Sequence, residues 1–94
     1  MTPVHPGRVL RREMQARKLS ANALALALRV NSGRITEILN GQRGVSPETA
    51  MRLGRYFGNE ARFWLNLQTN YELSRAEAEL GDRIAAEVAP AASS

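Results

Sequence analysis

Residues 20–41 read SANALALALRVNSGRITEILNG, and this stretch predicts two short helices joined by a tight turn. Ser20 can cap the first helix, in which Leu24 and Leu28 recur at the spacing of one helical face. The apolar pattern then breaks, and either Asn31 or Ser32 can cap the second helix. Two helices connected in this way predict a helix-turn-helix, whose second helix lies in the major groove of DNA.

The apolar residues of this stretch support close packing of the two helices. Ala25 is small and lies on the inner face of the first helix, so the second helix can cross close to it. Val30 can fill the space beneath the turn between the two helices. Gly41 ends the second helix at a position that often requires a left-handed conformation. The predicted inner face of the second helix consists of Ile35, Ile38 and Leu39.

The spacing resembles that of the lambda-repressor-like (XRE) helix-turn-helix family. The matching residues are Leu19, Ser20, Leu24, Ala25, Leu28, Val30, Ile35, Asn40 and Gly41. Arg29 occupies a turn position that usually carries glycine in this family, so we expect local strain or a shifted turn. Ala21 stands where many members carry a glutamine that contacts phosphate, so we expect that contact to be absent.

Length and composition limit the possible functions. A chain of 94 residues is expected to form one domain, and without cysteine it can form neither a disulfide nor a cysteine metal site. A single histidine cannot bind a metal alone, so we expect no metal and no cofactor. The sequence contains no nucleophile–base arrangement or phosphate-binding glycine motif, so we do not expect an enzyme. Without a signal peptide or membrane-spanning run, we expect a cytoplasmic protein with no membrane partner.

The charge is distributed unevenly along the chain. Residues 1–58 contain ten arginine or lysine residues and three acidic residues, whereas residues 59–94 contain three basic and six acidic residues. The basic part coincides with the predicted helix-turn-helix, which favours an interface for an anionic polymer there and a protein partner elsewhere. Uneven solvated charge without a function is the alternative.

The second helix of the helix-turn-helix carries side chains suited to reading bases. Arginine can bridge guanine O6 and N7, threonine can contact a thymine methyl group, and glutamate can accept a hydrogen bond from cytosine N4. Glu37 could instead orient an arginine through an ion pair. The predicted base contacts are Ser32, Gly33, Arg34, Thr36 and Glu37.

Three residues are predicted to contact DNA phosphates: Asn22, Ser32 and Arg43. Asn22 and Ser32 lie near helix starts, where the backbone dipole favours an anion. Both could instead be ordinary helix caps. Arg43 lies in the turn between Gly41 and Gly44, on the expected DNA side.

All five aromatic residues fall between Tyr56 and Tyr71. Trp64, Leu67 and Tyr71 share one helical face, whereas Phe63 lies off it, so this helix is apolar on more than one side. We expect a second copy of the chain to cover part of this surface, with Phe63, Leu67 and Tyr71 at the dimer interface. Packing of the whole cluster within one protomer is the alternative, and Trp64 is the first candidate for that core.

With these residues the chain resembles the HigA (VapI-type) antitoxins. The resemblance covers about residues 5–73, and its motifs are HPG at 5–7, ITEILNGQRGVS at 35–46, LGRYFG at 53–58, FWLNLQ at 63–68, and Tyr71. It implies a homodimeric antitoxin that neutralises a HigB-type toxin, an mRNA-cleaving ribonuclease of the RelE superfamily. It also implies that the protein represses its own operon at a palindromic double-stranded DNA operator. A stand-alone XRE-family repressor without a toxin partner is the alternative.

The expected fold is therefore all-α: a lambda-repressor-like five-helix DNA-binding domain with an additional C-terminal helix. Residues 1–73 form the XRE-type domain with its dimerising aromatic helix, and residues 74–94 form a helical extension and a disordered tail. Ser74 and Glu77 fit a capping box that would start the extension, and Leu80, Ile84 and Val88 would give it an apolar face. The extension could pack on the partner subunit, remain loosely held or contact the toxin.

Overall fold

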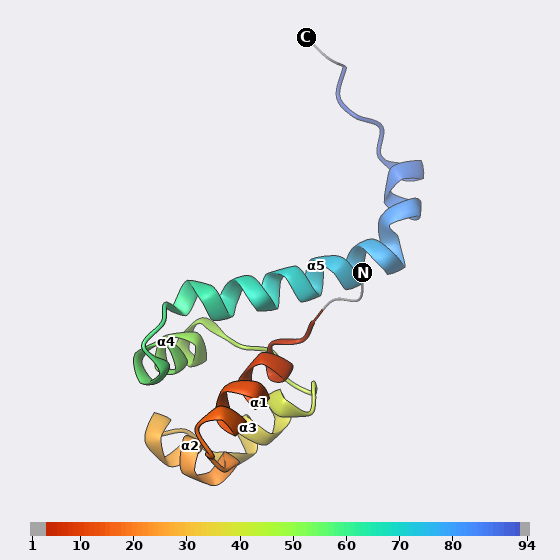
Figure 1. The fold of residues 1–94 in the computed structure, drawn as a ribbon. Helices are drawn as coiled ribbons and strands as arrows, with labels where there is room; N and C mark the ends of the chain where they lie inside the picture. Colours follow the sequence, from red (N-terminus) through yellow and green to blue (C-terminus); the bar gives the residue numbers. More distant parts are fainter. Residues whose placement is uncertain (1–3, 93–94) are drawn as a thin grey trace.

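The computed structural model describes residues 4–92, which form five α-helices and no strand. These are α1 (Pro6–Ala16), α2 (Ala21–Leu28), α3 (Ser32–Leu39), α4 (Pro47–Phe57) and α5 (Ala61–Glu87). Figure 1 shows α1 to α4 gathered into one cluster, with α5 lying across it and projecting beyond it. The molecule measures 53 × 25 × 22 Å, so it is elongated along this projection. The predicted all-α, five-helix architecture is confirmed.

The core lies between α1 to α4 and the first turns of α5. Trp64 is fully buried, and its indole N–H donates to the Asn59 side-chain oxygen at 2.9 Å, which satisfies the one polar atom of the ring. The predicted inner faces of the helix-turn-helix are confirmed: Leu24, Ala25 and Leu28 are buried, Ile35 and Ile38 have no exposed area, and Leu39 is half-buried against the core. The buried apolar residues are Leu10, Met14, Leu24, Ala25, Leu28, Ile35, Ile38, Val45, Ala50, Leu53 and Trp64.

The HPG motif joins three helices. The His5 ring nitrogen Nδ1 accepts a hydrogen bond from the Gly7 amide at 2.9 Å, so His5 caps α1. A Cβ atom on Gly7 would overlap the carbonyl oxygen of Ile38, so only glycine lets α1 approach the end of α3 this closely. The His5 ring also meets the edge of Tyr71 in α5, with 4.8 Å between ring centroids.

The two helices of the helix-turn-helix are capped by side chains. Ser20 Oγ accepts from the Ala23 amide at 3.0 Å, as predicted, and Asn31 rather than Ser32 caps α3. Arg29 adopts a left-handed conformation, with φ 61° and ψ 45°. The unusual turn expected at this non-glycine position is therefore confirmed.

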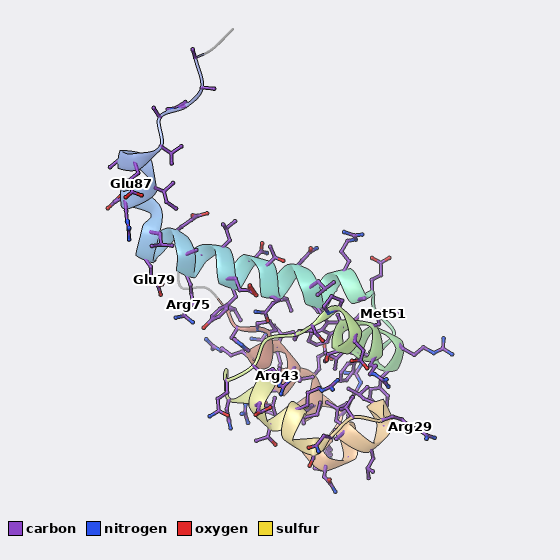
Figure 2. All side chains as sticks on the ribbon, turned by 180° about the vertical axis from the view of Figure 1, so that it is seen from behind. Arg29, Arg43, Met51, Arg75, Glu79 and Glu87 are labelled. Carbon is purple, nitrogen blue, oxygen red and sulfur yellow. The ribbon has the colours of Figure 1, made fainter. Side chains whose placement is uncertain are left out.

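The C-terminal extension continues α5 and is not a separate helix. The helix runs from Ala61 to Glu87 without a break, so the predicted start at Ser74 is wrong. Between Tyr71 and Gly81 no proline or glycine interrupts it, and an established helix propagates more readily than a new one nucleates. Figure 2 shows the helix changing direction near Glu79, close to Gly81. The proposed domain boundary at residue 73 falls inside this helix.

The ends of the described chain carry no helix. Val4 and His5 precede α1, and residues 88–92 follow α5 without regular secondary structure. The predicted disordered tail extends into residues 93–94, which, like residues 1–3, lie outside the described residues.

His5 makes stability depend on pH. Burial lowers the pKa of His5 below its ordinary value of 6.5, because the charged form loses solvation. Its contribution to stability is therefore present above about pH 6.5 and is lost as the pH falls through the lowered folded-state pKa. We expect the melting temperature to fall between about pH 7.5 and about pH 5, and the fall to be smaller in His5→Asn, which can still cap α1. Thermal melts of both proteins across this range test this, and equal pH dependence would contradict it.

Candidate nucleic-acid interface

The N-terminal half of α3 forms the exposed face of the helix-turn-helix. Burial of Ile35 and Ile38 on one side leaves Ser32, Gly33 and Thr36 exposed on the other. A hollow of about 570 Å³ lies over this face. Its lining residues are Asn31, Ser32, Gly33, Arg34, Thr36, Glu37 and Arg43. The structure thus brings together all five predicted base-contact residues and adds Arg43.

The predicted phosphate contacts lie in two places. Ser32 and Arg43 line the hollow, whereas Asn22 lies exposed in the first turn of α2 and does not line it. The caps of α2 and α3 are Ser20 and Asn31. The alternative interpretation of Asn22 and Ser32 as ordinary caps is therefore wrong, and their exposed side chains remain available to a ligand.

Hydrogen bonds within α3 occupy part of this face. The Gly33 amide donates to Asn31 Oδ1 at 2.7 Å, and the Thr36 hydroxyl donates to the Ser32 carbonyl at 3.2 Å. Thr36 stays exposed, and this bond uses neither its methyl group nor its hydroxyl lone pairs, which suits contact with a base edge.

Arg43 is held against α3 by an ion pair. Its Nε lies 2.9 Å from Glu37 Oε1, and both side chains are about half exposed. Glu37 therefore orients an arginine, which is one of the two roles the sequence left open for it. Because the pair is solvated, the carboxylate can yield Arg43 to a phosphate at small cost.

The turn that carries Arg43 is anchored to α5 by Gln68, which the sequence analysis did not single out. Gln68 Oε1 accepts from the Val45 amide at 2.8 Å, and its Nε2 donates to Glu72 at 2.8 Å. A Cβ atom on Gly44 would lie 2.6 Å from Gln68 Nε2, so glycine admits this side chain. Gln68 closes the FWLNLQ motif, but Asn66, Thr69 and Asn70 are polar as well, so the sequence carries no signal that distinguishes Gln68.

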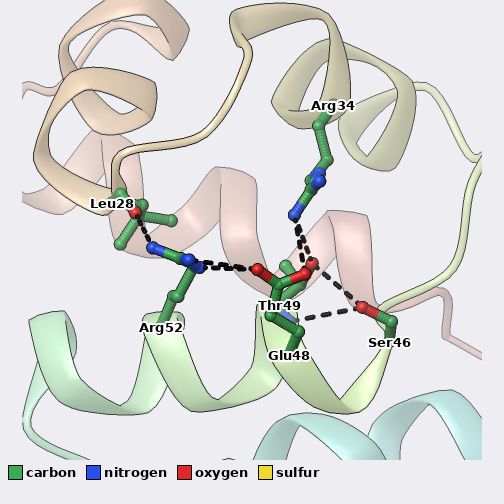
Figure 3. A network of polar contacts seen from close by, with 6 residues as sticks. All are labelled: Leu28, Arg34, Ser46, Glu48, Thr49 and Arg52. Atoms are coloured by element: carbon green, nitrogen blue, oxygen red, sulfur yellow. Dashed lines mark hydrogen bonds and ion pairs between the residues drawn. The ribbon is translucent and has the colours of Figure 1, made fainter.

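The sequence predicts that Arg34 is an exposed residue that contacts a base, but the structure places its side chain differently. Its side chain is 29% exposed and turns toward α4, where Nη1 lies 3.5 Å from Thr49 Oγ1 and 3.6 Å from Glu48 Oε1 (Figure 3). Glu48, an acidic residue in the first turn of α4, thus contacts the recognition helix α3. Arg34 still lines the hollow beside Arg43.

The residues predicted at a dimer interface divide into two groups. Phe63 is 42% exposed, whereas Leu67 is half-buried against the core and Tyr71 is half-buried beside His5. Trp64 occupies the core of the chain, as expected.

Within residues 4–92, every helix is too short or too polar to span a lipid bilayer. No group of three or more histidine, cysteine or acidic residues there could hold a metal ion.

A helix-turn-helix with an exposed, arginine-flanked recognition helix defines a DNA-binding protein of the helix-turn-helix class. The helix-turn-helix domain family matches residues 7–61. Virulence-associated protein I of Dichelobacter nodosus is 53% identical over 78 residues, which cover 82% of this chain and 72% of that protein.

Two solved structures extend the match over nearly the whole chain. An addiction module antidote protein of the HigA family from Coxiella burnetii is 44% identical, with a TM-score of 0.93 over 96% of this chain and 99% of that chain. The Pseudomonas aeruginosa antitoxin HigA, solved with the higBA promoter, is 44% identical, with a TM-score of 0.92 over 95% of this chain and 98% of that chain. The chain belongs to the HigA family of helix-turn-helix antitoxins.

Arg43 should supply sequence-independent affinity for DNA. Replacing a phosphate-contacting arginine weakens binding to all sequences equally, so Arg43→Ala should lower the slope of log K against log salt by about one unit. Titrations of specific and random duplexes at several salt concentrations measure this slope. Arg83→Ala, at an exposed position in distal α5, serves as the matched control and should leave the slope unchanged. A changed base preference with an unchanged slope would contradict the assignment.

Proposed function

We propose that this protein is the antitoxin of a type II toxin–antitoxin module. In this role it neutralises a HigB-type mRNA-cleaving toxin and, as a homodimer, represses its own operon by binding a palindromic operator. One observation carries the DNA-binding part: the exposed face of α3 forms a hollow that both Arg34 and Arg43 line. The P. aeruginosa relative solved with promoter DNA supports the same assignment.

Recognition proceeds through the N-terminal half of α3. The helix enters the major groove, where Arg34 bridges a guanine and Thr36 contacts a neighbouring base edge, with Ser32, Gly33 and Glu37 beside them. Arg43, Asn22 and Ser32 contact phosphates, which set the register of the helix on the duplex. Repression takes place in the cytoplasm, where bacterial operator DNA lies.

A homodimer supplies the second recognition helix that a palindrome requires. Half-sites one DNA turn apart need two copies of α3 about 34 Å apart. The apolar surface left on α5 supports pairing through this helix. Phe63 and the exposed parts of Leu67 and Tyr71 form its proximal part. A second exposed apolar stripe lies on distal α5. It consists of Leu73, Leu80 and Ile84, followed by Val88 at the C-terminal cap, and these residues are 40% to 63% exposed.

The toxin assignment rests on membership of the HigA family, and a stand-alone repressor is the competing function. We expect co-expression of the chain with the product of the adjacent reading frame to relieve growth arrest and to yield a complex on purification. A variant with both Arg34→Ala and Arg43→Ala is the matched control: it should lose DNA binding and still neutralise the toxin. Operator binding without neutralisation by the wild-type chain would identify a stand-alone repressor.

Arg34 should determine one base of the operator. A bidentate arginine–guanine contact discriminates by about 1–3 kcal/mol, so Arg34→Ala should relax preference at one position by that amount. Selection from a randomised duplex library, with the wild-type and variant proteins in parallel, measures preference position by position. Equal loss of affinity for specific and random duplexes would show that Arg34 does not read a base.

A further inference from the structure

A polar network around Glu48 joins α2, α3 and α4 (Figure 3). Glu48 Oε2 accepts hydrogen bonds from Arg52 Nε at 3.1 Å and Nη2 at 3.0 Å, and Glu48 Oε1 lies 3.6 Å from Arg34 Nη1. Arg52 Nη1 in turn donates to the carbonyl oxygen of Leu28 at 2.8 Å, at the C-terminal end of α2. One carboxylate therefore contacts an arginine of the recognition helix and an arginine that holds the preceding helix.

Thr49 provides a second, fixed acceptor for Arg34. Its side chain is only 2% exposed, and its Oγ1 accepts from Ser46 Oγ at 3.1 Å. Ser46 Oγ also accepts from the Thr49 amide at 3.2 Å, so the N-terminal cap of α4 and this acceptor form one unit. Arg34 Nη1, at 3.5 Å from Thr49 Oγ1, thus faces two acceptors on the first turn of α4.

The same arginine also lines the hollow on the recognition face. A guanidinium is planar and carries five N–H donors in a fixed fork. Contacts at Nη1 restrict both the position of the group and the orientation of its plane, while its other donors remain for a ligand. An arginine held in this way loses less rotamer freedom when it pairs with a base.

We infer that Glu48 is a positioning residue for DNA recognition: it holds the Arg34 guanidinium from behind and so sharpens the base preference of α3. This inference rests on the proposed function, because it assigns Glu48 a part in reading the operator. Glu48 itself need not contact DNA. Its 60% exposed side chain makes the ion pair a solvated one, so its effect on preference is moderate.

Two other roles for Glu48 would give different results when its charge is removed. If Glu48 competed with guanine for Arg34, neutralising the carboxylate would free the arginine and increase discrimination. If Glu48 only stabilised the fold through Arg52, its loss would lower the melting temperature and leave base preference unchanged.

The test compares full-length Glu48→Gln with the wild-type chain on a duplex selected by the wild type from a randomised library. We expect Glu48→Gln to reduce discrimination about two- to fivefold at the position that Arg34→Ala affects, as expected for loss of a solvated ion pair. In the Arg34→Ala background the same substitution should change nothing further at that position, since the residue it positions is gone. The inference would be overturned if Glu48→Gln increased discrimination or left it unchanged. It would also be overturned if Glu48→Gln reduced discrimination further in the Arg34→Ala background.

Two control variants separate positioning from stability. Arg52→Ala removes the contact to Leu28 and both hydrogen bonds to Glu48, but it leaves the two acceptors of Arg34 in the chain. It should therefore lower the melting temperature and reduce base discrimination less than Glu48→Gln does. Glu13→Gln neutralises an exposed acid paired with Arg17 in α1 and should alter neither. If the wild-type chain selects no sequence, both the proposed function and the inference fail. If the wild type and Glu48→Gln select the same sequence with equal preference, only the inference fails.

Discussion

Burial of Ile35 and Ile38 determines which residues of the recognition helix face outward. An eight-residue helix has one inner face, and once these two side chains have no exposed area its rotation about its axis is fixed. Burial of each isoleucine stabilises the fold by about 1.5–3 kcal/mol, so a rotated helix that exposed either residue would be costly. Ser32, Gly33 and Thr36 are outward-facing as a direct consequence.

The rest of the chain restrains this helix at both ends. Gly7 lets α1 lie against the carbonyl of Ile38 at the C-terminal end of α3, and Gln68 of α5 anchors the turn that follows. Near its N-terminal end, Arg34 reaches the first turn of α4. The motifs outside the helix-turn-helix thus act mainly by fixing the recognition helix and its flanking turn, and α5 combines this role with an unpaired apolar surface.

Features set by local sequence were predictable, and features set by docking of distant segments were not. The cap at Ser20 and the inner faces follow from neighbouring residues, whereas the unusual turn at Arg29 was expected from the resemblance to the XRE family. The contact of Arg34 with Glu48 and the bond of Gln68 to Val45 join different elements, so no spacing in the sequence indicates them. The false helix start at Ser74 has a related cause: a serine and a glutamate three residues apart also fit the interior of a continuing helix.

A measurement of stoichiometry and footprint on promoter DNA tests the central claim that two of these recognition helices read one palindrome. The DNA upstream of the reading frame is titrated with the protein, the mass of the complex is measured by sedimentation, and hydroxyl-radical cleavage maps the protected backbone. We expect two protomers per site and two protected segments about one DNA turn apart. A single protomer on the site, or protection of one segment alone, would contradict it.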